Sequence, residues 1–327
     1  MINLVESRKS KVERLHGLGT ALITPFKADG SVDFEALARL LDTQLTGFVD
    51  YIVVLGTTGE AATMTADEKK QVRLFIVDYV SHNPSPVTHN RIPLVLGVGG
   101  NNTAAVCAEL EAMREELMRD YAAVLSVCPY YNKPNQEGLF QHFCKIAEAS
   151  PIPVLLYNVP GRTGVNLLPK TVMRIYEAHP EKIAGIKEAS GNVDQIKHLI
   201  DESRKTKDKR PLSTLSDSGL STLSPQDGLL VISGDDGIAC ELMEAGAAGL
   251  ISVASNAFPE DFWHIVHDKD AALQAKYAEM VRLLFAEGNP VGIKAVLTQK
   301  GIIANHLRLP LVPASKELQA QIQKELA

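Results

Sequence analysis

The chain has 327 residues, of which 45% are hydrophobic and 22% charged, a composition typical of folded globular proteins. Its 39 Asp and Glu residues outnumber 33 Lys and Arg residues, which gives a formal net charge of -6. Because nucleic-acid-binding surfaces need excess positive charge, this balance excludes nucleic acid as an expected partner. The four cysteines form no C-x-x-C pair, and no apolar run approaches the roughly 18 residues of a membrane helix. We therefore expect reduced thiols, no membrane association and a cytoplasmic location.

Eight short apolar runs recur along the chain, each closed by a polar or Gly-containing turn and followed by a segment of helical periodicity. Strands that alternate with helices in this way are typical of parallel sheets with right-handed crossovers. Eight such units favour an α/β fold of the (β/α)8 TIM-barrel type, and a doubly wound sheet is the alternative. We expect strands at residues 19–24, 52–55, 93–97, 122–127, 153–157, 183–187, 229–233 and 248–253.

The domain arrangement follows from these runs. We assign residues 1–17 to an N-terminal extension, 18–255 to the catalytic barrel and 256–327 to a helical C-terminal region. Helical periodicity in that last region predicts helices near residues 259–267, 271–287, 290–301 and 315–326. We expect the region to lie outside the catalytic apparatus. A Ser/Thr-rich segment at residues 212–224 predicts an exposed loop.

Active sites of α/β barrels lie at the carboxyl ends of the strands, so the residues that close each run are the candidates. The sixth run ends in Lys187, and the two-residue period of a strand places this lysine on the same face as Gly185, which would leave it room. A lysine removed from water there loses affinity for its proton, and the neutral amine is a nucleophile toward carbonyls. The alternative is a surface lysine at the start of a loop.

Two more candidates follow the fifth run. Tyr157 closes it and could act as a general acid or base, or simply pack as an aromatic at the barrel rim. Arg162 lies in the Pro/Gly turn that follows, where its planar guanidinium could bind a carboxylate with two hydrogen bonds. The alternative for Arg162 is a solvent-exposed loop arginine.

The second run is followed by Gly56-Thr57-Thr58-Gly59-Glu60, a loop that offers hydroxyl and backbone N–H groups. Such a loop suits a small anion such as a carboxylate, although turn and helix-capping duties would also explain it. It lacks the spacing of a nucleotide-binding P-loop. No H-x-H or H-E-x-x-H motif and no G-x-G-x-x-G motif after the first strand is present, so we expect neither a metal nor a dinucleotide cofactor.

Taken together, the strand-end motifs resemble those of the pyruvate-dependent class I aldolase family that includes N-acetylneuraminate lyase. The resemblance extends from about residue 19 to residue 313 and includes NPVGIKAVL (289–297) and LRLPLVP (307–313). No single motif is specific, but their order along the chain is. The motifs are GTTGE (56–60), PYYN (129–132), YNVPGRTG (157–164), GIKEAS (185–190) and SGDD (233–236).

The resemblance implies a lyase in which Lys187 forms a Schiff base with pyruvate, without metal or organic cofactor. It implies a proton relay of Thr57 and Tyr157, completed by Tyr131 from a neighbouring subunit of a homotetramer that is a dimer of dimers. Thr58 would hold the carboxylate of pyruvate through its backbone N–H.

For the second substrate, the resemblance implies that Arg162 receives the carboxylate of L-aspartate 4-semialdehyde. The carbonyl groups of Gly234 and Ile251 would border the Schiff-base pocket. Lyases of the neuraminate type have no arginine in this turn, so Arg162 favours the dipicolinate branch of the family. The product there is 4-hydroxy-tetrahydrodipicolinate, in diaminopimelate and lysine biosynthesis.

Two alternatives remain at this level. One is a related pyruvate lyase that accepts another aldehyde, and the other is a catalytically silent barrel that serves as a binding protein. The joint presence of Lys187, Tyr157 and Tyr131 counts against a silent barrel.

Members of the family that L-lysine inhibits carry histidines after GTTGE and a glutamate after the third strand. Because the matching positions here are Ala61, Ala66, Lys69 and Ala105, with only Asn101 retained, we expect weak or no inhibition by lysine.

Overall fold

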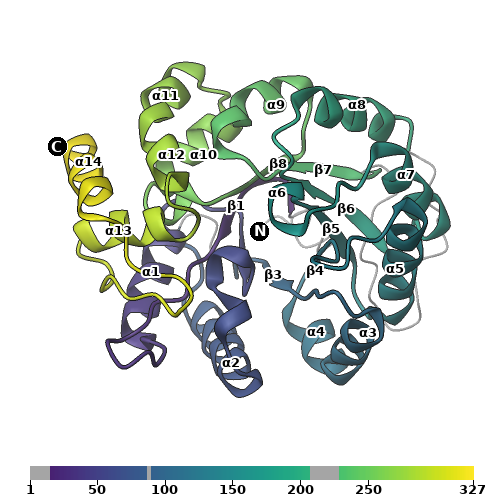
Figure 1. Ribbon diagram of the computed structural model, residues 1–327, viewed down its shortest axis with the longest axis horizontal. Coiled ribbons are helices and arrows are strands. Elements are labelled where there is room, and N and C mark those ends of the chain that lie inside the picture. The colour runs from purple at the N-terminus through teal and green to yellow at the C-terminus, as the bar shows by residue number, and fades with distance from the viewer. Residues whose placement is uncertain (1–14, 87–89, 207–227) are drawn as a thin grey trace, which may run out of the picture. The chain divides into compact units, whose positions relative to one another are not determined.

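The computed structural model describes residues 15–86, 90–206 and 228–327 (Figure 1). Eight strands form a closed barrel in the order of the sequence, and the strand pairs are parallel. This confirms the predicted (β/α)8 fold. The strands are β1 (Gly17–Ala21), β2 (Tyr51–Val54), β3 (Leu94–Gly97), β4 (Ala123–Val127), β5 (Val154–Asn158), β6 (Ile183–Glu188), β7 (Leu230–Ser233) and β8 (Gly249–Ser252).

Every predicted strand overlaps an observed one, and the differences are at the ends. The first strand begins two residues early, at Gly17, and stops at Ala21. The fifth and sixth strands each extend one residue further than expected, to Asn158 and Glu188. These two added residues are polar but fully buried. A prediction from apolar runs ends each strand at its last apolar residue and therefore leaves them out.

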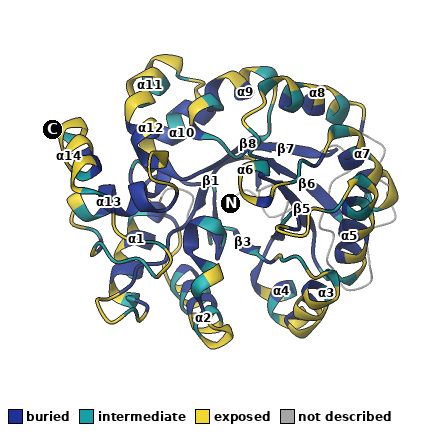
Figure 2. Cartoon of the chain, in the orientation of Figure 1, coloured by how far each residue is buried: buried dark blue, intermediate teal, exposed yellow. Residues whose placement is uncertain are grey.

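Helices follow the strands and cover the barrel, with apolar residues on their inner faces. Figure 2 shows strands that are buried along their length and helices that are buried on one side only. Those up to β8 are α1 (Phe34–Thr46), α2 (Ala66–His82), α3 (Thr103–Ala112), α4 (Arg114–Asp120), α5 (Gln136–Ala149), α6 (Pro160–Thr163), α7 (Pro169–Ala178), α8 (Val193–Arg204) and α9 (Ala239–Ala245).

Local sequence explains where several helices begin. Thr65 and Glu68 form a reciprocal capping box at the start of α2. Asn135 and Asn192 cap α5 and α8 by accepting hydrogen bonds from backbone N–H groups in the first turn. The helix starts that lead away from β2, β4 and β6 are therefore encoded locally.

The C-terminal helices are α10 (Pro259–His267), α11 (Ala271–Lys276), α12 (Ala278–Phe285), α13 (Val291–Gln299) and α14 (Lys316–Leu326). They confirm the predicted helices, except that the second expected helix is divided at Tyr277. The Ser/Thr-rich segment at residues 212–224 lies outside the described residues. All four cysteines are free, as expected, and three of them are buried.

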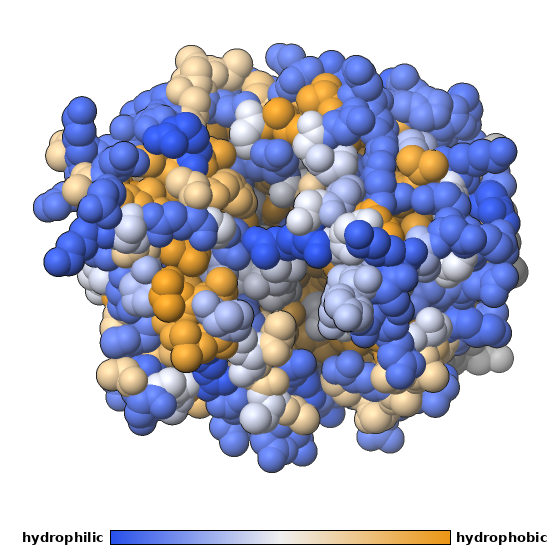
Figure 3. Space-filling model, in the orientation of Figure 1, coloured by the Kyte–Doolittle hydropathy of each residue, from blue (hydrophilic) through white to orange (hydrophobic). Residues whose placement is uncertain are grey.

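The chain divides into two compact units. The first unit contains residues 93–235 and 242–249, and the second unit contains residues 17–92, 236–241 and 250–327. The face of the molecule in Figure 3 is mostly hydrophilic, with apolar residues in scattered patches. None of the helices within the described ranges combines the length and hydropathy that crossing a lipid bilayer demands.

His142 on α5 makes the stability of the first unit depend on pH. Its ring is buried, Nδ1 lies 2.8 Å from Thr103 Oγ1 on α3, and burial lowers the pKa of the imidazole to about 4. An unfolded histidine titrates near pH 6.5, so between that pH and 4 the unfolded chain binds more protons than the folded one. The contribution of neutral His142 is therefore complete above about pH 6.5 and is lost as the pH falls toward 4.

We predict that this residue lowers the free energy of unfolding by about 2 to 3 kcal/mol between pH 6.5 and 4, at about 1.4 kcal/mol per pKa unit. Urea unfolding of the wild type and of His142→Gln at several pH values measures the effect, because the variant lacks the contribution of this histidine to the pH dependence of the free energy of unfolding. His198→Gln, an exposed histidine on α8, is the control. Parallel pH profiles for wild type and His142→Gln would contradict the assignment.

Candidate active site

Lys187 and Tyr157 lie side by side at the ends of two adjacent strands. The parallel register of β5 and β6 pairs these two residues directly, and only 5% of Lys187 and 7% of Tyr157 are exposed. Lys187 Nζ lies 4.6 Å from the centroid of the Tyr157 ring. This is the geometry of a cation–π contact with the face of the ring. The structure thus places a buried amine beside a phenol.

Gly185 and Gly234 each make room for a different neighbour. A Cβ on Gly185 would lie 2.3 Å from the Leu230 carbonyl oxygen, so this glycine permits the close approach of β7. The three atoms nearest to that Cβ all belong to Leu230, so a contact with β7 is the closest one that a side chain at this position would make. A Cβ on Gly234 would instead lie 2.9 Å from Lys187 Cε and 2.6 Å from Ala189 Cβ. Gly234 after β7 therefore clears the side of the lysine.

Arg162 lies on a short helical turn after β5. Pro160 occupies the first turn of α6, and Gly164 ends it with a left-handed φ of 73°. Backbone N–H groups of Arg162 and Thr163 both donate to the Val159 carbonyl. The arginine side chain is exposed, while Thr163 anchors the turn from the buried side. The turn presents Arg162 outward, in accord with a role in binding a substrate from solution.

Tyr131 is 88% exposed and has a φ of 74°, in the left-handed region that residues other than glycine rarely adopt. Asn101 holds the loop around Tyr131. Its side-chain Nδ2 donates to the Tyr130 carbonyl at 3.1 Å, and its backbone carbonyl accepts from Asn132 Nδ2 at 3.0 Å. Lys187, Tyr157, Arg162 and Tyr131 all belong to the first unit. Within the chain, the phenol ring of Tyr131 points to solvent.

The second unit carries Thr57, Thr58 and Ile251. Thr57 and Thr58 form a single 3-10 turn, η3 (Thr57–Gly59), after β2. Thr58 is buried, and its Oγ1 accepts a hydrogen bond of 2.9 Å from Asn289 Nδ2 in the C-terminal region. Ile251 is buried within β8. The threonine turn is therefore supported by a residue more than 200 positions away in the chain.

Glu60 closes the threonine turn and connects it to a buried polar network. Its backbone adopts a left-handed φ of 53° and its N–H donates to the Thr57 carbonyl at 3.1 Å. The carboxylate is ion-paired with Lys294 on α13, and both side chains are almost entirely buried. Burial lowers the pKa of Lys294 to about 8, although Glu60 opposes that shift.

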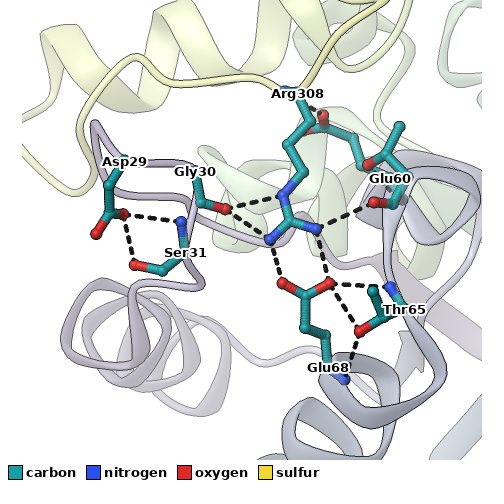
Figure 4. A network of polar contacts seen from close by, with 8 residues as sticks. Asp29, Gly30, Ser31, Glu60, Thr65, Glu68 and Arg308 are labelled. Carbon is teal, nitrogen blue, oxygen red and sulfur yellow. Dashed lines mark hydrogen bonds and ion pairs between the residues drawn. The ribbon is translucent and has the colours of Figure 1, made fainter.

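Arg308 extends this network (Figure 4). Its backbone N–H donates to Glu60 Oε2 at 3.2 Å, and its guanidinium contacts the Gly30 and Thr63 carbonyls and the Glu68 carboxylate. The pKa of Glu68 falls to about 2, first because Arg308 donates to its carboxylate and then because the Thr65 N–H does. Arg308 and Lys294 both lie 4.3 Å from the centroid of the Phe26 ring.

The C-terminal region thus contacts the predicted carboxylate-binding loop through Asn289, Lys294 and Arg308, which the sequence did not indicate. Asn289 and Lys294 belong to the motif at 289–297, and Arg308 belongs to the motif at 307–313, both of which contribute to the family resemblance. The spacing of residues within these motifs does not indicate which residues they contact. Among the described residues, no group of three His, Cys, Asp or Glu side chains is arranged to hold a metal ion.

Comparison with known proteins identifies the family of the chain. The chain matches the Dihydrodipicolinate synthetase family over residues 14–208 and 220–327. It is 43% identical over 319 residues to a 4-hydroxy-tetrahydrodipicolinate synthase of Azobacteroides pseudotrichonymphae, covering 95% of this chain and 96% of the relative. A synthase of the same name from Parabacteroides distasonis is 45% identical over 306 residues, covering 91% and 92%.

Solved structures show the same similarity. The crystal structure of dihydrodipicolinate synthase from Thermotoga maritima superposes with a TM-score of 0.82 at 35% identity, covering 95% of this chain and 97% of that one. The enzyme from Aquifex aeolicus gives a TM-score of 0.81 at 30% identity, covering 95% and 97%. With the sequence matched almost throughout and the fold shared, the chain belongs to the dihydrodipicolinate synthetase family.

Proposed function

We propose that this protein condenses pyruvate with L-aspartate 4-semialdehyde to form 4-hydroxy-tetrahydrodipicolinate, as a lyase of the class I aldolase type. The observation that carries the proposal is the buried amine of Lys187 at the end of β6, beside Tyr157 and flanked by a glycine. A buried lysine amine at a barrel strand end is suited to carbonyl chemistry. The relatives that share the chain almost from end to end carry the name of this synthase.

The chemistry begins when the neutral Lys187 amine adds to the keto carbon of pyruvate. Loss of water gives a protonated Schiff base, and removal of a proton from the methyl carbon gives an enamine. The enamine carbon attacks the aldehyde carbon of the second substrate, whose oxygen takes up a proton. Ring closure by the amino group of the acceptor displaces Lys187 and releases the product. Each step moves protons and electron pairs only, so it needs no metal or redox cofactor.

We assign the proton transfers to Tyr157, whose ring lies against the amine. We assign Thr57 and Tyr131 to the same relay. The exposure of Tyr131 on a loop held by Asn101 supports a role in a neighbouring subunit, since the ring points away from its own chain. A homotetramer built as a dimer of dimers would supply that subunit. We also place the enzyme in the cytoplasm.

The substrate carboxylates fall to two different loops. Thr58 lies in the first turn of η3, where backbone N–H groups suit a small anion, and we assign it to pyruvate. Arg162 can form paired hydrogen bonds to the carboxylate of aspartate semialdehyde. We assign the carbonyls of Gly234 and Ile251 to the border of the Schiff-base pocket. Weak feedback by lysine stays a prediction from the sequence.

Borohydride reduction in the presence of pyruvate tests the central step. We expect a reduced pyruvyl adduct on Lys187 by peptide mass mapping, and no adduct in Lys187→Arg, because the guanidinium is not a nucleophile. Tyr157→Phe should retain some adduct while kcat falls by about 10²- to 10⁴-fold, the usual contribution of acid–base catalysis. Absence of any adduct in the wild type would overturn the proposal. An adduct without turnover of aspartate semialdehyde would indicate a pyruvate lyase with another acceptor.

Arg162→Ala tests the identity of the acceptor. Loss of hydrogen bonds to a charged group costs about 1.5 to 3 kcal/mol, so the KM for aspartate semialdehyde should rise about 10- to 100-fold. The KM for pyruvate should change little, because pyruvate is assigned to Thr58. Steady-state kinetics with each substrate varied in turn measures both values. Equal increases in the two KM values would contradict this role of Arg162.

Gly234→Ala tests the glycine that flanks the lysine. The added Cβ would come within 2.9 Å of Lys187 Cε, which displaces the amine or the strand end. We expect the rate of borohydride trapping with pyruvate to fall at least about tenfold, since small misplacement of reacting groups is costly. Gly161→Ala, on a glycine with open space around it, is the control. A trapping rate unchanged in Gly234→Ala would show that the lysine does not depend on this space.

A further inference from the structure

Glu188 follows Lys187 on β6 and is fully buried. Because successive side chains of a strand point to opposite faces, its carboxylate faces away from the amine. A buried carboxylate is costly unless donors satisfy it. Here Oε1 accepts from the Ser190 backbone N–H at 2.7 Å, and Oε2 accepts from Asn158 Nδ2 at 2.9 Å and Gln195 Nε2 at 3.1 Å. Three donors from the ends of β5 and β6 and from α8 therefore converge on one side chain.

Two of these donors also hold the loop that carries Arg162. Asn158 precedes the loop, and its Oδ1 accepts from the Leu167 N–H at 2.9 Å, on the far side of the loop. Asn158 Nδ2 also donates to Asn166 Oδ1 at 2.8 Å. Asn166 and Gln195 exchange two further hydrogen bonds, of 2.9 and 3.1 Å. Both ends of the segment from 158 to 167 are thus bound to each other and, through Glu188, to β6.

The carboxylate of Glu188 is the group that these amides share. Both Asn158 and Gln195 direct an amide N–H to the same oxygen, so the position of one amide depends on the other through this acceptor. Arg162 stands on a turn of four residues between the two anchored ends. The backbone that carries Arg162 is therefore held at both ends by anchors that meet at Glu188, which belongs to the same strand as Lys187.

We propose that Glu188 is a positioning residue for the aldehyde substrate: its buried carboxylate fixes the loop that presents Arg162 to the substrate carboxylate. The inference rests on the proposed function of Arg162 and adds a second residue to acceptor recognition. A loop that is already ordered binds its ligand without a further ordering cost. A purely structural glutamate would support the whole barrel and affect both substrates alike.

Glu188→Gln is the sharpest variant, because it keeps the shape of the side chain and replaces one acceptor oxygen with an NH₂ donor. The new NH₂ group cannot accept a hydrogen bond in either orientation of the amide. In one orientation it faces the Ser190 N–H, and in the other it faces the NH₂ groups of Asn158 and Gln195. We expect the KM for aspartate semialdehyde to rise about tenfold, the loss of roughly one charge-assisted hydrogen bond. The KM for pyruvate and the yield of borohydride-trapped pyruvyl adduct should stay within about twofold.

A double-mutant cycle with Arg162→Ala separates positioning from general destabilisation. If Glu188 acts through Arg162, Glu188→Gln in the Arg162→Ala background should raise the KM for the aldehyde no further. Glu177→Gln, an exposed glutamate on α7, is the matched control and should leave both KM values unchanged. Asn166→Ala removes one anchor without touching the glutamate and should give a smaller increase for the aldehyde alone.

Equal effects of Glu188→Gln on both KM values, or fully additive effects with Arg162→Ala, would overturn the proposal. If Glu188→Gln does not fold, Asn166→Ala decides it by the same comparison of the two KM values. A wild-type enzyme that forms the pyruvyl adduct and turns over the aldehyde, together with such symmetric effects, rejects only the role of Glu188. A wild type that forms no adduct rejects the proposed function and this inference with it.

Discussion

The pairing of Tyr157 with Lys187 across β5 and β6 is the constraint on which the candidate site depends. Parallel strands in register bring two residues thirty positions apart to the same level of the barrel, and burial brings the amine against the aromatic face. A lysine amine in this position, next to a phenol at the carboxyl end of a barrel strand, lies where α/β barrels place their reactive groups. Gly185 lets β7 approach β6 closely, and Gly234 leaves space beside the lysine. A side chain at either position would displace the strand or the amine.

Buried carboxylates hold the loops on which the other candidate residues stand. In the first unit, Glu188 binds both anchors of the Arg162 loop. In the second unit, Glu60 closes the threonine turn while its side chain is ion-paired with Lys294 and accepts from the Arg308 N–H. Removing one partner from such a buried pair leaves an uncompensated charge, whereas the intact pair adds little net stability. Each carboxylate therefore ties its loop to partners from several elements.

Several features of the site could be predicted from the sequence. Lys187, Tyr157 and Arg162 close or follow apolar runs, and the barrel rule that active sites lie at carboxyl ends of strands selected them without knowledge of any contact. Predictions of strands at β5 and β6 stopped one residue short because Asn158 and Glu188 are polar, and hydrophobic periodicity treats buried polar residues as the end of a strand. Those two residues are the ones that anchor the Arg162 loop.

By itself, the sequence determined the alternation of strands and helices and the chemical types at the strand ends, because these depend on neighbours within a few residues. Only the tertiary structure decided which distant groups meet. Asn289 reaches Thr58, and Lys294 reaches Glu60, across more than 200 residues of chain. Such contacts depend on how the closed barrel and its C-terminal helices pack, and no local pattern of residues encodes that packing.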